Sequence, residues 1–359
     1  MDVEVVRVGE LSNHHLGVWA RLQETDPVLA SPFFRPEFAQ AVADVRNDVF
    51  VGIMEGPQGA IGFFPFQRGR WAVGVPVGGE RSNYHGVIAE PGAWWDARSL
   101  LRGCGLRIWD FHHLVAAQAQ FDTFRVTSVN SFVVDLSGGL DRYAEDLRAA
   151  GSRVISRLRQ QTRRIEREIG PIHFEPHVAD VEVLRTLMLW KSAQYQRTGE
   201  PDRFATEWNV RLLERIHREQ SAGFSGMLAA IYAGDTLAAV TMGLRAGPVF
   251  HWWFPSYEQT LSSYSPGLIL LLCLVDHAES IGLRAIDLGK DHAPYKERWA
   301  NSLVSLAEGS VTTTAALSAA RMLRRTGRDV IRHSPFAHAA QRVSRRLRLR
   351  ADQRGSRLR

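Results

Sequence analysis

Three consecutive segments with strand character, joined by very short connections, limit what the second half of this 359-residue chain can fold into. Gly234 and Gly247 stand in the two connections, and glycine between such segments is typical of β-hairpins. An apolar helix over 265–282 and another strand over 283–288 follow. The pattern predicts an antiparallel meander continued by a helix and a strand, with the meander strands over 226–233, 236–245 and 248–255.

The segments around the meander complete a sheet flanked by helices. The chain before it predicts an arginine-rich helix, a short strand and two further helices, over 143–169, 173–177, 181–196 and 208–220. After it, we expect a helix over 293–300 and a last strand within 301–314. Apolar residues at helical spacing indicate the helices, and glycine and proline mark their ends.

The first half predicts a less complete version of the same order. We expect a strand, two helices, a group of hairpin strands, a helix and two strands, over 3–6, 14–29, 34–45, 49–77, 93–103, 106–111 and 132–136. The chain is therefore expected to be a mixed α/β (α+β) protein of two tandem lobes, each a mainly antiparallel sheet flanked by helices. The expected parts are an N-terminal lobe at 1–140, a C-terminal lobe at 141–314, and a tail at 315–359.

The positive charge of the chain is concentrated at its end. The formal net charge is +6, from 44 Lys and Arg against 38 Asp and Glu, but 311–359 holds 13 arginines against only Asp329 and Asp352. That segment therefore carries +11, and the rest of the chain about −5. We expect a basic helical or disordered tail, whose partner would be an anionic membrane surface or RNA. Lysine is scarce by comparison, since it occurs only at Lys191, Lys290 and Lys296.

The remaining composition indicates a cytoplasmic protein without a metal site. The only cysteines, Cys104 and Cys273, form no CxxC pair and no Cys/His spacing typical of zinc ligands. The N-terminal segment lacks the apolar region of a signal peptide. The longest apolar run has eight residues, whereas a membrane span needs roughly 20. Nothing in the sequence implies a stable protein partner.

Three short motifs combine residues that bind ligands or carry protons. The apolar helix begins with Tyr264-Ser-Pro-Gly-Leu268, in which Ser265 is expected to cap the helix and Pro266 to occupy its first position. The strand over 283–288 leads into Asp287-Leu-Gly-Lys-Asp-His-Ala-Pro-Tyr-Lys-Glu-Arg-Trp299. The first half contains Ser82-Asn-Tyr-His-Gly86.

These motifs, with the order of elements, resemble the GNAT acyltransferases related to the cellulose-biosynthesis CelD proteins, themselves relatives of the Fem-type peptidoglycan aminoacyltransferases. In that group a Ser-Pro-Gly helix start precedes a strand that ends in a Gly-Asp-x-x-Tyr-Lys-like loop with a Trp soon after. The sequence departs from the pattern at Lys290, which is inserted between the Gly and the Asp, and at Asn83, where the family more often has Asp. The resemblance covers roughly residues 1–305.

The resemblance implies an acyl-CoA donor, most simply acetyl-CoA, at the start of the apolar helix. The positive end of a helix favours anions, and Gly267 leaves room for a ligand to approach the backbone. The usual Gln/Arg-x-x-Gly-x-Gly/Ala pyrophosphate loop is absent here. The residues expected to hold the donor are Ser265, Pro266, Gly267, Leu268 and Lys290.

Acyl transfer to an amine or hydroxyl needs a base for the acceptor proton and a donor for the developing oxyanion. Asp291 is the expected base, with Asp287 as its alternative. Tyr295 is expected to protonate the leaving thiolate or donate to the carbonyl oxygen, and Lys296 to bind phosphate or carboxylate. We expect a small-molecule or saccharide acceptor to bind between the lobes, next to Tyr84, His85, Tyr195, Trp253 and Trp299.

Two other functions remain compatible with the sequence. The arginine-rich helix and the missing pyrophosphate loop also permit a Fem-like enzyme that takes its acyl group from aminoacyl-tRNA. A non-catalytic protein that binds nucleic acid or membrane through its basic tail is the second alternative. Deleting the chain after Leu317 would abolish binding in that case, yet leave any acyl transfer intact.

Overall fold

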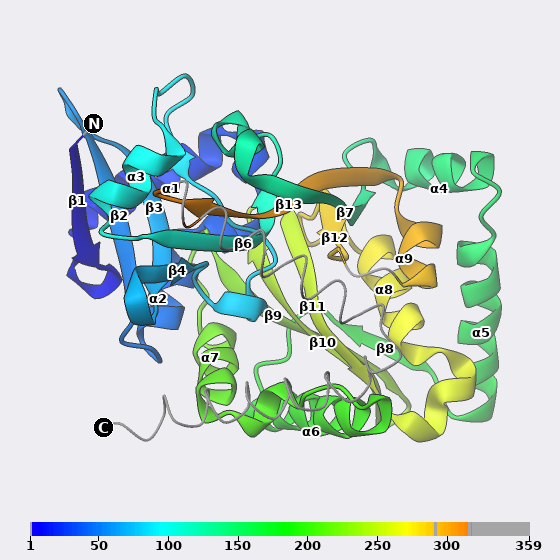
Figure 1. Cartoon of the computed structure of the whole chain (residues 1–359). Coiled ribbons are helices and arrows are strands. Elements are labelled where there is room, and N and C mark those ends of the chain that lie inside the picture. Colours follow the sequence, from blue (N-terminus) through cyan, green and yellow to red (C-terminus); the bar gives the residue numbers. More distant parts are fainter. Residues whose placement is uncertain (1, 291–292, 315–316, 318–359) are drawn as a thin grey trace, which may run out of the picture.

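The computed structural model describes residues 2–290, 293–314 and 317. The expected basic tail and Asp291 therefore lie outside the described residues, apart from Leu317 in the tail. The described chain forms a mixed α/β structure around one sheet that runs through both lobes (Figure 1). None of the described helices is both long and apolar enough to cross a membrane.

The first lobe follows the order expected from the sequence. Glycine-containing turns separate its strands, and α1 packs against β3 while α2 packs against β2. Its elements are β1 (Asp2–Arg7), α1 (Asn13–Thr25), α2 (Pro36–Ala43), β2 (Val49–Gly56), β3 (Gly59–Arg68), β4 (Val73–Val75), β5 (Ile88–Ala89), α3 (Ala97–Gly103), β6 (Ile108–Val115) and β7 (Arg125–Asp135).

The second lobe contains the predicted meander, with α6 and α7 on one face of its sheet and α8 with α5 on the other. The antiparallel pairing of β9 with β10 and of β10 with β11 confirms the hairpin prediction. The elements are α4 (Gly139–Ala149), α5 (Val154–Glu168), β8 (Ile172–Glu175), α6 (Val181–Thr198), α7 (Glu207–His217), β9 (Ser225–Ala233), β10 (Thr236–Ala246), β11 (Val249–Tyr257), α8 (Pro266–Asp276), β12 (Ala285–Asp287), α9 (Pro294–Trp299) and β13 (Ser302–Thr312).

The two lobes are joined by strands that pair across the expected boundary. The order in the sheet is β1-β2-β3-β4-β6-β13-β7-β12-β11-β10-β9-β8, with β5 attached to β3. The last strand, β13, thus lies between β6 and β7, and β7 pairs with β12 of the second lobe. Because each lobe contributes a strand to the other's part of the sheet, neither half can separate without breaking backbone hydrogen bonds.

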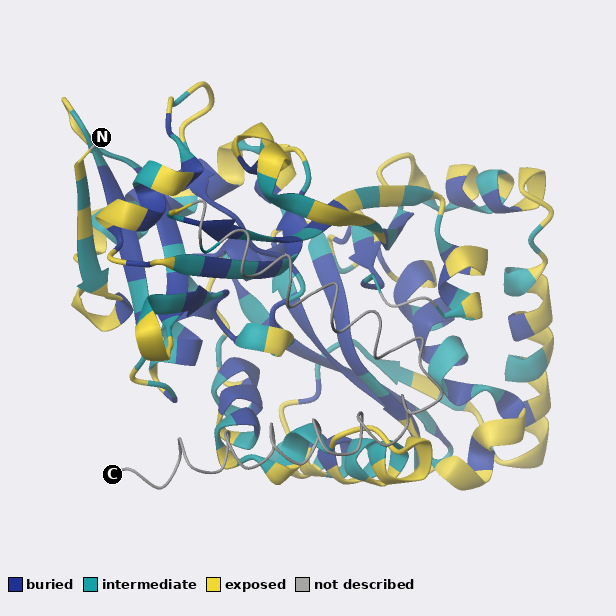
Figure 2. Ribbon diagram, viewed as in Figure 1, coloured by how far each residue is buried: buried dark blue, intermediate teal, exposed yellow. Residues whose placement is uncertain are grey.

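The hydrophobic core is also continuous between the lobes. One cluster of buried residues takes side chains from α1, α2 and β2 and from α6, α7 and the meander, with Phe38, Val51, Leu184, Leu213 and Trp253 among them. A second cluster fills the space between the meander, α5 and α8. Figure 2 shows the meander strands as mostly buried and the outer face of α5 as exposed.

Several predicted helices differ from the structure at their ends, and the one expected over 265–282 already ends at Asp276. Two others differ at a glycine or a proline. The single arginine-rich helix expected over 143–169 is divided into α4 and α5, because Gly151 takes a positive φ of 74° between them. The helix expected from Phe34 begins only at Pro36, after a short 3-10 turn at Pro32–Phe34. In both cases glycine or proline adjusts the backbone inside a segment whose apolar spacing is helical throughout.

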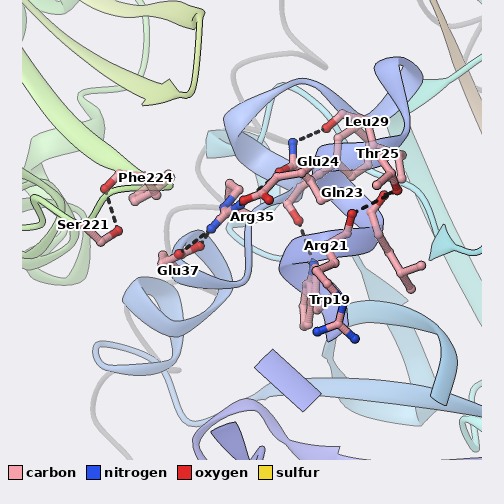
Figure 3. Close-up of polar contacts among 12 residues, drawn as sticks. Trp19, Arg21, Gln23, Glu24, Thr25, Leu29, Arg35, Glu37, Ser221 and Phe224 are labelled. Carbon is pink, nitrogen blue, oxygen red and sulfur yellow. Dashed lines mark hydrogen bonds and ion pairs between the residues drawn. The ribbon is translucent and has the colours of Figure 1, made fainter. Parts of the chain in front are cut away.

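A buried arginine stabilises the first lobe where it meets the second (Figure 3). The guanidinium of Arg35 is 2.5 Å from Glu24 Oε1 and 2.8 Å from Glu37 Oε1. It also donates to Gln23 Oε1 at 3.3 Å. A side chain at Gly223, in the second lobe, would collide with this guanidinium. Although burial opposes it, pairing with Glu37 and Glu24 raises the pKa of Arg35.

Candidate active site

A cavity of about 1140 Å³ lies between the lobes, beside the ends of β11 and β12. The first lobe lines it with residues such as Arg81 and Asn83, and the second with α6, α9 and residues after β12. Six cationic and four acidic side chains are among the described lining residues, namely Arg46, Arg81, Lys191, Arg203, Lys290 and Lys296 with Asp48, Glu80, Glu200 and Asp202. The charged side chains therefore give the cavity an excess of positive charge.

All three lysines of the chain line this cavity. Lys290 donates to His112 O and pairs with Glu308 Oε1, each at 2.7 Å. The Nζ atom of Lys296, which is buried, lies 3.4 Å from Gly289 O. Lys191, on α6, donates to Gln194 Oε1 at 2.9 Å. In a chain with 44 basic residues, this convergence identifies the cavity as the place where compact ammonium groups gather.

Asp287 lies beside the cavity as a buried anchor between the lobes. Its carboxylate accepts hydrogen bonds from the Tyr84 hydroxyl, from Ser131 Oγ at 2.6 Å and from Gly289 N at 2.8 Å. Burial alone would raise the pKa of Asp287, but His251, Ser131 and Tyr84 together bring it below its usual value. Burial and the Asp287 charge raise the pKa of Tyr84 well above its usual value.

His251, at the parallel pair of β11 and β12, connects Asp287 to the cavity wall. Its Nδ1 atom is 3.6 Å from Asp287 Oδ1, and its Nε2 atom is 2.8 Å from Asn83 Nδ2. Because an amide nitrogen can only donate, Nε2 is the acceptor in this contact. Asn83, which lines the cavity, is thereby held by the second lobe.

Gly289 occupies the point where these groups come closest. It takes a positive φ of 80°, which favours glycine. A Cβ atom there would be 3.6 Å from Lys296 Nζ, 3.8 Å from Asn83 Nδ2 and 4.0 Å from His251 Cε1. The motif glycine thus gives the backbone a turn that brings an ammonium and an amide to the same place on the cavity wall.

The expected acceptor residues divide between the cavity and the core. Tyr195, Trp253 and Tyr295 line the cavity, and Trp253 Nε1 donates to Arg81 O at 3.0 Å. Tyr84 is buried behind the wall, as described above. Trp299 is completely buried in the core of the second lobe.

The remaining expected acceptor residue, His85, is buried in the first lobe. Its Nε2 atom accepts from the backbone N–H groups of His112 and His113, at 3.1 and 2.9 Å. Burial lowers the pKa of His85 well below its usual value, so the ring is neutral. We infer packing roles for His85 and Trp299.

The four expected donor residues at the start of α8 lie outside the described lining of the cavity. Lys290, the fifth expected donor residue, is part of that lining. The helix begins at Pro266, as predicted, but Ser265 makes no side-chain capping bond. Its φ of 58° and ψ of 49° place it in the left-handed region, whereas a side-chain cap needs an extended residue. Leu268 packs partly buried against the core.

Several residues of the site were not singled out by the sequence. His251 stands in an apolar strand and Ser131 among polar residues of β7, so neither belongs to a recognisable motif. The only signal for Asn83 was its departure from the family pattern. Lys191 could have been found from the scarcity of lysine alone.

The described fold and this site define a two-lobed protein with the GNAT fold. Residues 152–297 match the family model described as an acetyltransferase (GNAT) domain. No curated protein sequence matches the chain.

Three solved structures are similar to nearly the whole chain. FemX covers 89% of this chain and 99% of its own, with 7% identity and a TM-score of 0.57. L-PGS from Bacillus licheniformis covers 87% and 95%, with 11% identity and a TM-score of 0.52. The C-terminal domain of an Agrobacterium fabrum protein assigned as a lysylphosphatidylglycerol synthetase covers 87% and 96%, with 11% identity and a TM-score of 0.52. At these identities the likeness concerns the fold alone.

Proposed function

We propose that this protein transfers an acyl group, most simply acetyl from acetyl-CoA, to an amine or hydroxyl of a small-molecule or saccharide acceptor. The observation that carries the proposal is that β11 and β12 separate beside the cavity. Their parallel pairing ends at His251 and Asp287, although β11 continues to Tyr257. The cavity with Tyr295 and Lys296 lies directly beside this opening.

The opening between the strands would receive the donor. Beyond His251, none of the described residues pairs with β11 on the β12 side, so its backbone groups there can pair with an extended ligand. The first turn of α8 lies at the far end of β11, where a Cβ on Gly267 would be 3.6 Å from the Tyr257 ring. N–H groups of a first helical turn suit the phosphates of CoA.

The acceptor would occupy the cavity, with its amine or hydroxyl near Gly289. Transfer forms a bond from the acceptor nitrogen or oxygen to the acyl carbon and breaks the carbon–sulfur bond of the thioester. The acceptor loses one proton, for which Asp291 is the proposed base. The departing thiolate gains one, for which Tyr295 is the proposed acid, and Lys296 would stabilise negative charge on the carbonyl oxygen.

In this proposal residues 141–314 form the acyltransferase domain, and residues 1–140 form a lobe that completes the acceptor wall. The chain would belong to the CelD-like group on the strength of its motifs. The role of the tail at 315–359 stays a prediction.

The proposal is tested by incubating the protein with acyl-CoA and a panel of amino sugars, amino acids and polyols. We expect free CoA thiol and acylated acceptor in equal amounts. The Asp291→Ala and Lys296→Ala variants should lose turnover while remaining folded by circular dichroism. Wild-type rates in both variants would end this assignment of residues.

One observation favours a second candidate, transfer from aminoacyl-tRNA. Arg157 and Arg163 on α5, and Arg153 just before it, are exposed, and a group of exposed arginines attracts a phosphate backbone. Under this alternative, the chain should bind charged tRNA with an affinity that falls steeply with salt. It should also give no heat with any acyl-CoA.

A further inference from the structure

The side of the cavity formed by α6 holds an ammonium group in a cationic environment. Lys191 is partly buried, and its one described hydrogen bond is the neutral one to Gln194. Burial and the charges of Arg203 and Lys296 lower the pKa of Lys191 to about 8. Among the described residues, the charges that act on this ammonium are therefore those of cations.

Lys191 and Arg203 both lie over the aromatic ring of Tyr195. The Lys191 Nζ atom lies 5.8 Å and the Arg203 guanidinium carbon 5.9 Å from the centre of the Tyr195 ring. The backbone of Arg203, in the 3-10 turn Arg203–Ala205, accepts a hydrogen bond from the buried Asn209 amide. Asn209 also accepts from Arg81 Nε at 3.0 Å, which ties this turn to the first lobe. These hydrogen bonds fix the backbone that carries Arg203 at the cavity wall.

The nearest acidic residues along the chain do not neutralise this pair. Asp202 Oδ1 accepts from Ser192 Oγ at 3.1 Å and from Phe204 N at 2.9 Å, which fixes the start of the turn. Asp48, across the cavity, pairs with Arg46 at 2.7 Å. Glu200 also lines the cavity, but it is not among the charges that set the pKa of Lys191.

Like charges held together in a partly buried site oppose folding unless an anion compensates them. Arginine next to lysine over an aromatic ring is suited to a carboxylate or phosphate, which accepts from both. Tyr195 and Trp253 add flat apolar surface at the same end of the cavity. The structure thus supplies a preformed place for the anionic end of a larger molecule.

We propose that the acceptor carries a carboxylate or phosphate group, which Lys191 and Arg203 bind on the α6 side of the cavity. That the bound molecule is an acyl acceptor rests on the proposed function. The anion site itself does not depend on it, because it can be measured without donor or turnover.

The test uses the scarcity of lysine. Full-length protein labelled with ¹³C at lysine Cε gives three lysine signals by NMR, assigned with single Lys→Met variants. Inorganic phosphate and acetate are titrated separately at constant ionic strength. We expect the Lys191 signal to move with saturation and its apparent pKa to rise, while the signal of Lys290, already paired with Glu308, moves much less.

Two matched variants complete the experiment. Arg203→Gln should weaken anion binding about tenfold or more, since it removes a charged donor. Arg211→Gln, an exposed arginine on α7 that does not line the cavity, should leave binding unchanged. Saturation by phosphate alone would assign a phosphate group, and saturation by both probes a site that accepts either.

Equal effects of the two arginine variants, or a Lys191 signal that neither probe moves at saturating concentration, would overturn the proposal. An anion response without any acyl transfer would leave the anion site in place and remove the proposed function. Acyl transfer without the anion response would support the proposed function and overturn the anion site.

Discussion

The cationic side of the cavity leads to a prediction about stability. The Lys191→Met variant replaces a partly buried ammonium by an apolar side chain of similar length. The pKa of Lys191 is lowered from 10.5 to about 8. A pKa difference of about 2.5, at about 1.36 kcal/mol for each, gives roughly 3 kcal/mol as the upper limit of the penalty at pH 7. Because water reaches part of the side chain, we expect the variant to be about 1–3 kcal/mol more stable than the wild type.

The gain should depend on pH in a defined direction. Between about pH 8 and 10.5 the unfolded chain holds a proton on Lys191 that the folded chain has lost, so wild-type stability rises with pH. The advantage of Lys191→Met is therefore complete below about pH 8 and vanishes towards pH 10.5. Urea denaturation at pH 7 and pH 10, followed by tryptophan fluorescence, measures both values.

Lys290→Met is the control for this prediction, because it removes an ammonium that is paired with Glu308 and bonded to His112 O. It should lower stability at pH 7 rather than raise it. A Lys191→Met variant that is no more stable than wild type at pH 7, or equally stabilised at pH 10, would refute the electrostatic reasoning.

Three further substitutions test other parts of the structure. Arg35→Met should lower the free energy of unfolding by about 1–3 kcal/mol in urea, since Glu24 and Glu37 lose their buried partner; an unchanged value would contradict this role. Tyr84→Phe removes a donor to Asp287, so acid unfolding should begin at a higher pH than in wild type, and an identical acid midpoint would count against that hydrogen bond. Tyr295→Phe should reduce acyl transfer about 100-fold with normal circular dichroism, whereas full activity would exclude it as the acid.

The order of elements could be predicted because glycines in the sequence mark the turns between strands. Gly234 and Gly247 take positive φ values between the meander strands, as their place in the sequence suggests. The pairing of β7 and β13 across the lobes could not be predicted from the sequence. It depends on pairs such as Ser302 with Val133, which join distant segments. Local patterns determine which segments become strands, whereas packing of the whole chain determines which strands meet.

The candidate site was predicted where composition is unusual. Lysine is scarce, so Lys290 and Lys296 drew attention, and both line the cavity. His251 could not be found this way, because it stands among apolar strand residues and acquires its partners only when β11 meets β12. Tyr84 was placed at the acceptor, but its hydroxyl contacts Asp287 across the lobes instead. Such roles depend on contacts between residues about 200 positions apart.

The most direct test of the central claim is a calorimetric titration of the wild-type protein with acetyl-CoA, longer acyl-CoAs and free CoA. If the opening between β11 and β12 receives an acyl-CoA, at least one thioester should give a saturable heat with one site per chain. No heat with any of the three ligands would contradict the acyl-CoA assignment and favour the aminoacyl-tRNA or non-catalytic alternatives.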